Sequence, residues 1–524
     1  MPIRMTGMVS GLDTDSIVKE LVSAYSTKKE KYEKERTKLG WKQEIWKSLN
    51  KEVNSFYKSA GNLRFDSGYN TKKTTSSDST KATVSASGNA TVGTQKLHVL
   101  STAQSGYLTG AEIKTAANEK VTTSTKLSDL GVTADEITFN VGPANNSASG
   151  TTKQIKVGKD STISDVVNQL KDAGLNANFD AGNGRFYLSS SDSGYATDFN
   201  ITADSSDTNS TTLLNALGLG DTAKKIDGSD AVIVLNGVKY TSTTNNFSIN
   251  GLSISVNGVT DKVDDLEKVD VDALDDSKAV SISTTTDTQG IYDKIKDFLT
   301  SYNNIINKMT KLYNADSAKN YEPLTDDEKS QMSDSEVEKW ETKIKDSLLR
   351  RDSNLSTIMN AMTTSMTKAI SINGKNYSLS SFGISTLGYM ISTLGYMNSA
   401  ENEQNAYHID GDEDDENTSG NKDKLMAALS SDPDTVIDFM KQLSTNLYTA
   451  IDKQMQSNSL RSRYSIYNDK EMTSQYTSYT KTIAEWERKI SDKEDYYYMK
   501  FSKMETALSK LNSQTSSLSG MFSS

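Results

Sequence analysis

Apolar residues recur at every seventh position near both ends of this 524-residue chain. Over many turns, this spacing predicts a long helix that buries one seam against a second helix. Neither stretch contains a proline, and each runs well past the length of an ordinary helix, which favours a coiled coil over two amphipathic helices packed on separate domains. The last stretch has Tyr476, Ile483, Ile490, Tyr497, Met504, Leu511 and Leu518 on its seam, and the first has Val18, Tyr25, Tyr32, Leu39, Trp46, Val53 and Ala60.

A second line of seventh positions accompanies each seam, and polar residues interrupt both of these lines. In the first stretch the polar residues fill the middle, so the coil should be weaker and more exchangeable than an unbroken one. We therefore expect the two chain ends to pair, with the rest of the chain as one large insertion between them. One second line runs Leu21, Lys28, Glu35, Lys42, Leu49, Phe56 and Leu63, and the other runs Met472, Tyr479, Trp486, Lys493, Lys500, Ala507, Gln514 and Met521.

Composition excludes several classes of function. Hydrophobic residues make up 35% of the chain, below the usual apolar share even when the 31 glycines are added, so part of the chain should be extended or thinly cored. The net charge of −11 argues against nucleic acid as a partner, because its binders present a basic surface. The absence of cysteine excludes disulfides, thiol catalysis and cysteine-based zinc sites.

The apolar runs argue against a membrane protein. Residues 1–7 lack the apolar core of a secretory signal. The longest clean apolar run, residues 231–235, is far shorter than the ~20 residues that span a bilayer. We therefore expect no membrane insertion, and any export should use a route without a cleaved signal peptide.

No group of residues has the spacing of a catalytic, cofactor or metal site. His98 alternates with apolar neighbours on a predicted strand, which gives it a surface role, and His408 lies beside a polar loop. The acidic run 410–416 fails as a calcium loop, because position six is Asp415 rather than glycine and position twelve is Asn421 rather than glutamate. We expect this run to be a solvated loop, and we expect the protein not to be an enzyme.

The periodicity of the middle of the chain changes between strand and helix. Alternating residues predict half-buried strands, and an apolar residue every three or four positions predicts helices. Gly174 provides a stop signal for the first of these helices. Strands are expected at 96–100, 137–141, 154–157, 175–179, 186–188, 231–235 and 280–282, and helices at 162–173 and 291–312.

Several motifs give the chain a family resemblance. Residues 10–21 read SGLDTDSIVKEL and open the first long helix. Residues 323–329 read PLTDDEK, and residues 348–352 read LLRRD, although Ser347 stands where the family has glycine. Residues 496–508 complete the set within the last helix. In this order the motifs resemble the flagellar filament-cap family, the FliD proteins; the resemblance also covers the strands at 230–260 and is weak over 105–228.

The resemblance and the periodicity together predict an α+β multidomain fold. Its terminal helices pair as a coiled coil, next to a helical bundle domain and two β-rich head domains, one inserted in the other. The predicted division gives residues 1–45 and 484–524 to the coiled-coil leg, 46–75 and 284–483 to the helical bundle domain, 76–104 and 229–283 to the β-rich head domain, and 105–228 to the inserted outer head domain.

The resemblance implies a structural cap at the distal tip of the bacterial flagellar filament, outside the cell. There it would promote the folding and insertion of exported flagellin. The implied partners are flagellin, further copies of the chain in a ring, often of five, and a flagellar export chaperone. Apolar residues near the two chain ends are the candidates for contact with the filament, although packing within the coil would bury the same residues. These candidates are Ile17, Val18, Leu21, Leu508, Leu511, Leu518 and Met521.

Two other functions remain open at this stage. The polar block 105–228 would suit an adhesin for mucin or other glycans on a host surface. A hook–filament junction protein would share the paired terminal helices, but the motifs at 10–21 and 323–329 favour the cap. The tandem repeat of residues 384–390 in 391–397 is either a doubled strand or a duplication in a tolerant loop, and the duplication is favoured because loops accept insertions cheaply.

Overall fold

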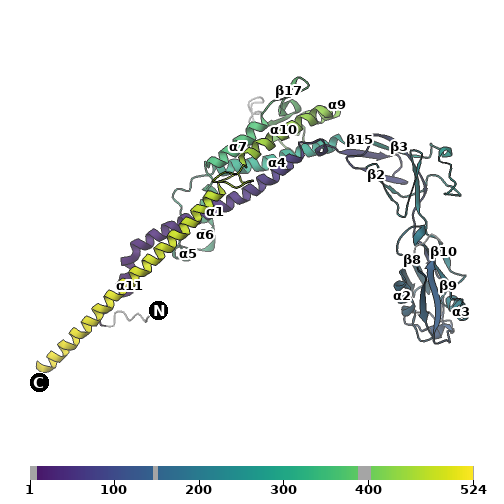
Figure 1. Cartoon of the computed structure of the whole chain (residues 1–524), viewed down its shortest axis with the longest axis horizontal. Coiled ribbons are helices and arrows are strands. Elements are labelled where there is room, and N and C mark those ends of the chain that lie inside the picture. The colour runs from purple at the N-terminus through teal and green to yellow at the C-terminus, as the bar shows by residue number, and fades with distance from the viewer. Residues whose placement is uncertain (1–8, 145–150, 388–402, 523–524) are drawn as a thin grey trace. The chain divides into compact units, whose positions relative to one another are not determined.

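The computed structural model describes residues 9–144, 151–387 and 403–522, with side chains as far as residue 519. The chain divides into two compact units, Met1–Tyr69 with Thr288–Ser524 and Asn70–Asp287. The first unit is mainly helical and the second is mainly β-sheet (Figure 1). This confirms the predicted α+β fold with long terminal helices.

The helical unit is built on two very long helices, α1 (Thr14–Asn62) and α11 (Asp469–Phe522). Small antiparallel hairpins and shorter helices complete this unit. The helices are α4 (Thr288–Asn314), α5 (Asp326–Ser330), α6 (Asp334–Ser347), α7 (Ser353–Met366), α9 (Lys424–Ser431) and α10 (Pro433–Gln454), and the strands are β16 (Ile370–Ile372), β17 (Lys375–Tyr377), β18 (Ile384–Thr386) and β19 (Tyr407–Ile409).

One apolar core joins the second half of α1 to α4, α7 and α10. Trp46 and Leu49 are fully buried there, and Phe56 lies 5.6 Å from Phe298 of α4, measured between ring centroids. The helix predicted over 291–312 is α4, whose apolar residues from Ile291 to Met309 face this core. The bundle therefore fixes one end of the long helix pair.

The β-rich unit contains a five-stranded sheet, ordered β1-β15-β3-β11-β12, and a three-stranded sheet, ordered β13-β14-β2. Every strand pair in them is antiparallel, and their facing sides share one apolar core. The strands are β1 (Lys72–Ser76), β2 (Ala82–Ala86), β3 (Gly93–Ser101), β11 (Ala231–Leu235), β12 (Val238–Ser242), β13 (Asn246–Ile249), β14 (Leu252–Val256) and β15 (Val280–Thr286).

Strand β11 explains the longest apolar run of the sequence, because it is buried on both faces. Ala231, Ile233 and Leu235 point into the core between the two sheets. Val232 and Val234 point the other way, under an apolar cluster from the segment 263–274 that crosses the outer face of the sheet. A strand covered on both sides loses the usual alternation of apolar and polar residues.

A second β-rich block, residues 105–228, has its own apolar core around Phe139, Leu170 and Phe186. The chain passes between the two cores where Gln104 and Ser229 exchange backbone hydrogen bonds of 3.0 and 3.1 Å. The division into four domains stays a prediction. The block consists of β4 (Tyr107–Thr109), β5 (Ile137–Pro143), β6 (Lys153–Val157), α2 (Ile163–Asp172), β7 (Leu175–Asp180), β8 (Arg185–Ser190), β9 (Phe199–Ala203), α3 (Ser210–Ala216) and β10 (Lys224–Ile226).

Local signals in the sequence set several boundaries. Thr162 caps α2 through a hydrogen bond from the Asp165 N–H, and Gly174 follows the helix with a φ of 98°. The hairpin β11–β12 turns through Asn236 and Gly237, both at positive φ, as a two-residue turn between antiparallel strands requires. Short 3-10 helices lie at Asp66–Gly68, Leu127–Leu130, Tyr195–Thr197, Val271–Ala273 and Leu379–Phe382.

Candidate functional site: the paired terminal helices

The terminal helices α1 and α11 lie side by side and run in opposite directions (Figure 1). The ring of Tyr25 lies 6.3 Å from that of Trp486, and the ring of Tyr32 lies 6.1 Å from that of Tyr479, measured between centroids. Seven residues forward on α1 thus correspond to seven residues back on α11. This confirms the predicted pairing of the chain ends and shows that it is antiparallel.

The buried face of α1 differs from the predicted second line near its N-terminus. Val18 is buried as expected, but Leu21 is 43% exposed and Val22, at 3% exposure, occupies the seam instead. Ile17 is half-buried. The face advances by four residues at each step here, and a repeat of seven counted from Leu21 misses it.

The polar middle of α1 faces the segment between α4 and α7. The Lys34 ammonium lies 3.8 Å from a Glu322 carboxylate oxygen, and the Lys42 ammonium lies 2.7 Å from an oxygen of Asp352. Asp352 also caps α7, because its carboxylate accepts from the Asn354 N–H at 2.9 Å. Lys42, which interrupts the second line of α1, therefore attaches the coil to the bundle, and Lys34 adds a further ion pair beside it.

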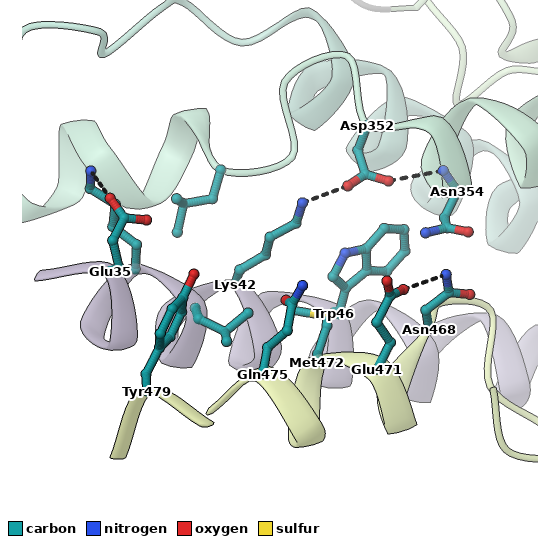
Figure 2. Close-up of a pocket in the computed structure, with 13 residues that line it drawn as sticks. Glu35, Lys42, Trp46, Asp352, Asn354, Asn468, Glu471, Met472, Gln475 and Tyr479 are labelled. Atoms are coloured by element: carbon teal, nitrogen blue, oxygen red, sulfur yellow. Dashed lines mark hydrogen bonds and ion pairs between the residues drawn. The ribbon is translucent and has the colours of Figure 1, made fainter. Parts of the chain in front are cut away.

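A groove of about 320 Å³ opens where α1, α11 and the start of α7 meet. Figure 2 shows the paired Lys42 and Asp352 on one side and the indole of Trp46 at its floor. The Trp46 ring stacks on Tyr467, with 5.3 Å between centroids and 8° between planes. Trp46 Nε1 has no hydrogen-bond partner among the described residues, so this side chain stabilises the fold through its apolar contacts.

The N-terminal end of α1 is tied to α11 by side chains. Asp13 caps α1, and the hydrogen bond from the Ser16 hydroxyl holds the pKa of its carboxyl below its ordinary value. The Tyr498 hydroxyl donates to Asp15 at 2.8 Å. The two residues Val9 and Ser10, which lie just before α1, bond to α11 as well. The Val9 N–H donates to the Glu505 carboxylate at 2.9 Å, and Ser10 donates to the same carboxylate.

Beyond Glu505, α11 continues without α1 beside it (Figure 1). Leu508 is half-buried, whereas Leu511 and Leu518 are 56% and 54% exposed. These three residues repeat at spacings of three and seven and so share one face of the helix. The side chain of Met521, the other candidate of this region, lies outside the described residues.

A network of tyrosines and charges stabilises the helical unit where α1 meets α10. Tyr57 stacks on Tyr448 at 4.3 Å, and its hydroxyl donates to Asp452 Oδ1 at 2.8 Å. Arg463 pairs with the same carboxylate at 2.6 Å. The hydrogen bond from Tyr57 and the charge of Arg463 hold the pKa of Asp452 below its ordinary value, although burial opposes this shift.

Replacing Asp452 with Asn should lower the free energy of unfolding by about 1–3 kcal/mol near pH 7, since the variant loses two charge-assisted hydrogen bonds. A carboxylate with a lowered pKa stabilises the folded state above its unfolded pKa of about 4 and loses that effect as the pH falls through the folded value. The difference in the free energy of unfolding between wild type and variant should therefore disappear between roughly pH 5 and pH 2. Urea unfolding across this range measures it.

The exposed Asp434 of the same helix provides the control, and Asp434→Asn should cost less than about 1 kcal/mol. A gap between wild type and Asp452→Asn that stayed constant down to pH 2 would show that the carboxylate charge contributes nothing.

Both histidines are buried or partly buried next to carboxylates. His98 is 4% exposed, and its Nδ1 lies 2.8 Å from Asp261 Oδ2. The predicted surface role of His98 is wrong, because the segment that carries Asp261 covers the outer face of the sheet. His408 Nδ1 lies 2.6 Å from Asp415 Oδ2.

The first half of the acidic run 410–416 is not the solvated loop that the sequence predicts. Asp410 and Asp412 are buried, and the Lys296 ammonium lies 2.6 Å from Asp412 and 2.7 Å from Asp414. Burial opposes the charge of Lys296, but these two carboxylates outweigh it and raise its pKa. Lys424 pairs with Asp410 at 3.2 Å, so each of the two buried carboxylates of the run has an amino group of the chain itself as its partner.

Three further features bear on function. Across the described part of the chain, no three His, Cys, Asp or Glu side chains gather as a metal site would require. Of the helices that the structure describes, none is both long enough and apolar enough to cross a membrane. The first copy of the tandem repeat begins in β18, and residues 388–397, with the whole second copy, lie outside the described residues.

Comparisons with known proteins place both parts of the chain in one family. The sequence model for the flagellar hook-associated protein 2 C-terminus matches residues 228–513, more than half of the chain, and the model for its N-terminus matches residues 10–106. Flagellar hook-associated protein 2 of Halalkalibacterium halodurans is 24% identical over 574 residues, which cover 99% of this chain and 100% of that protein.

Two further proteins are similar over part of the chain. B-type flagellar hook-associated protein 2 of Pseudomonas aeruginosa is 28% identical over 266 residues, 49% of this chain and 51% of that protein. The solved D1-D2-D3 domains of the flagellar cap protein FliD from Escherichia coli match at a TM-score of 0.44 and 18% identity, over 77% of this chain and 94% of that one. With both of its family models matched in order, this chain belongs to the flagellar hook-associated protein 2 family, whose members are structural, non-enzymatic proteins of the flagellum.

Proposed function

We propose that this chain caps the distal tip of a bacterial flagellar filament, where it promotes the folding and insertion of exported flagellin subunits. Membership of the flagellar hook-associated protein 2 family supports the capping role. The observation that carries the proposal is the uncovered leucine face at the end of α11. A long helix that extends beyond its partner and exposes leucines is built to enter an apolar groove of another molecule.

The leucine spacing supports a helix-in-groove contact with flagellin. Leu508, Leu511 and Leu518 stand at the positions through which an amphipathic helix anchors itself in a groove. Full burial of a leucine side chain gains roughly 1.5–3 kcal/mol, so Leu511 and Leu518 together can supply several kcal/mol of binding free energy. Met521 continues the apolar character of the segment toward the chain end.

The candidates at the start of α1 fit this role unequally. Leu21 is exposed and Ile17 is half-buried, so both can contact a partner while the coil stays closed. Val18 lies in the seam against α11 and would reach the filament only after the two helices separate. The polar residues in the middle of the seam favour such an exchange, because they leave the coil less tightly packed there.

The further partners belong to the same proposal. Copies of the chain would form a closed ring, often of five in caps, because identical head-to-tail contacts generate rings when the rotation closes. An export chaperone would cover the C-terminal helix before secretion. The assembled protein would stand outside the cell, at the filament tip.

Immunogold electron microscopy of intact cells, with an antibody to this chain, tests the proposed location. We expect a single label at the distal end of each filament. Label at the boundary of hook and filament would instead assign the chain to the junction proteins. Label over the cell body, with none on filaments, would contradict the cap and favour the adhesin.

A further inference from the structure

The segment that crosses the outer face of the five-stranded sheet is held there mainly by side chains. We call it the outer cover, and it consists of residues 261–276. At its start, the backbone N–H groups of Thr260 and Asp261 donate to the Val99 carbonyl at 2.8 and 3.4 Å. From residue 262 to residue 279, no backbone hydrogen bond between described residues joins the chain to the sheet. A segment with so few backbone bonds opens locally at a lower free-energy cost than the strands beneath it.

His98 of β3 lies between the two ends of the outer cover. Its Nδ1 is 2.8 Å from Asp261 Oδ2, and its Nε2 is 3.6 Å from Asp276 Oδ1. A neutral imidazole carries one N–H group, whereas the charged imidazolium carries one on each nitrogen. The charged ring therefore attracts both ends of the cover at once, and the neutral ring can donate to only one of them.

The contact with Asp261 is the stronger of the two. This pair is buried, its distance is that of a hydrogen bond, and Asp261 Oδ2 also accepts from the Thr260 hydroxyl at 2.7 Å. A carboxylate at this distance keeps the last proton of the ring on Nδ1. When the ring loses its charge, Nε2 presents a lone pair to Asp276, and the attraction at that end of the cover is lost.

The other charged groups around His98 come from three elements. Lys96, on the same strand, bonds to the Asp276 carboxylate, and this bond with the charges of Lys96 and His98 holds the pKa of that carboxyl below its ordinary value, although burial opposes the shift. Asp275 adds a further carboxylate, and Lys239 of β12 donates to a carbonyl in the middle of the cover. Strands β11 and β15 contain no charged residue. Carboxyl and amino groups ordinarily keep their charge between about pH 5.5 and about pH 8.5, where histidine titrates.

We propose that His98 is a pH-sensitive latch on the Asp276 end of the outer cover. The charged ring holds this end on the sheet at low pH, and the contact is lost as the pH rises and the ring gives up its proton. The Asp261 end stays in place throughout. Release loosens the cover above Val232 and Val234, which are buried beneath it. The latch lies within the β-rich unit and does not rest on the proposed capping function.

Hydrogen exchange of the purified full chain, followed by mass spectrometry, tests the latch. The protection of residues 270–279, corrected for the intrinsic pH dependence of exchange, should fall about three- to fivefold between about pH 5.5 and about pH 8.5. The protection of β3 and of residues 259–263 should change less than about 1.5-fold, because the Asp261 end remains bonded.

Nuclear magnetic resonance identifies the group that titrates. The chain has two histidines, so isotope-labelled imidazole rings give two signals, and the variant His408→Gln assigns them. The His98 signal and the exchange of residues 270–279 should change over the same pH range. A His98 signal that stays constant while the exchange changes would assign the pH response to another group and overturn the latch.

Two variants remove the latch, and a third is a matched control. Asp276→Asn replaces an exposed carboxylate, so the fold should persist, while residues 270–279 should exchange faster than in wild type at about pH 5.5 and lose their pH response. His98→Gln leaves a side chain without charge and should also remove the pH response. Asp272→Asn replaces another exposed carboxylate of the outer cover, for which no described contact with His98 exists, and should keep the wild-type response.

Equal protection of residues 270–279 at the two pH values in wild type would overturn the latch. A full pH response in Asp276→Asn would overturn it as well. Losses of the same size at both ends of the outer cover would also contradict it, since the whole segment would then loosen rather than one end. Circular dichroism at both pH values checks that folded chains are compared throughout.

Discussion

Cells that carry Leu511→Asp together with Leu518→Asp should secrete the protein but fail to build filaments of normal length. Each substitution puts a carboxylate where the proposed contact buries a leucine, and an unpaired buried charge costs several kcal/mol. A loss of about 3 kcal/mol already weakens binding more than a hundredfold. Filament lengths in electron micrographs, with the secreted flagellin measured in the medium, report the effect.

The opposite face of the same helix supplies a matched control. Ser513→Asp with Ser517→Asp adds the same two charges and leaves the leucines in place, and it costs less helix propensity, because serine and aspartate have similar propensities whereas leucine is a better helix former. This double variant should build filaments of normal length. All four positions are exposed, so neither double variant should change the unfolding of the helical unit by more than about 1 kcal/mol. Filaments of normal length in the leucine double variant would contradict the proposed contact.

Replacing Trp46 with Ala should destabilise the helical unit by about 3–5 kcal/mol, the cost of removing a large buried side chain. Trp46 is fully buried at the point where the coil enters the bundle, stacked on Tyr467. The bundle packs on it from one side and Met472 of α11 lies on the other. Urea unfolding followed by circular dichroism at the helical signal measures the loss.

Two other variants separate the contributions of this side chain. Trp46→Phe should cost much less than Trp46→Ala, because Nε1 has no partner among the described residues to lose. Trp41→Ala removes a half-buried tryptophan five residues earlier, whose ring centroid lies 4.7 Å from the Lys345 ammonium, and should cost only about 1 kcal/mol. Equal losses for Trp41→Ala and Trp46→Ala would show that Trp46 does not anchor the coil in the bundle.

Features that depend on neighbours in the sequence were predictable. The pairing of the chain ends follows from a repeat of seven, and α4 follows from apolar residues every three or four positions. Helix α2 has both its capping threonine and its terminal glycine in the sequence. In each case a local pattern is enough, because it specifies which face of an element is apolar.

Features that depend on contacts with residues far away in the sequence were not predictable. The strand pattern placed His98 on the outer face correctly, but Asp261, 163 residues away, buries it. Asp412 of the acidic run is buried because Lys296, 116 residues before it, pairs with its carboxylate. The exchange of Leu21 for Val22 in the seam is different, because the buried residues at the start of α1 are Thr14, Val18 and Val22, and this spacing of four departs from the repeat of seven.

The candidate site was therefore predictable in its composition but not in its geometry. The sequence pointed to Leu508, Leu511 and Leu518, yet the coil packing would have hidden the same residues if α1 extended as far as α11. The structure shows where α1 begins, and the bonds from Val9 and Ser10 to Glu505 mark the point beyond which the leucines are exposed. The periodicity of the sequence does not show at which residue one helix extends beyond the end of the other.

Photo-cross-linking from position 518 in growing cells tests the central claim most directly. Leu518 is replaced by a photoreactive amino acid, the filaments are sheared off after illumination, and the adducts are identified by mass spectrometry. The account predicts adducts between this chain and flagellin, recovered with the distal filament ends. Adducts that contain only hook or junction proteins, or none with flagellin while the filaments grow normally, would contradict it.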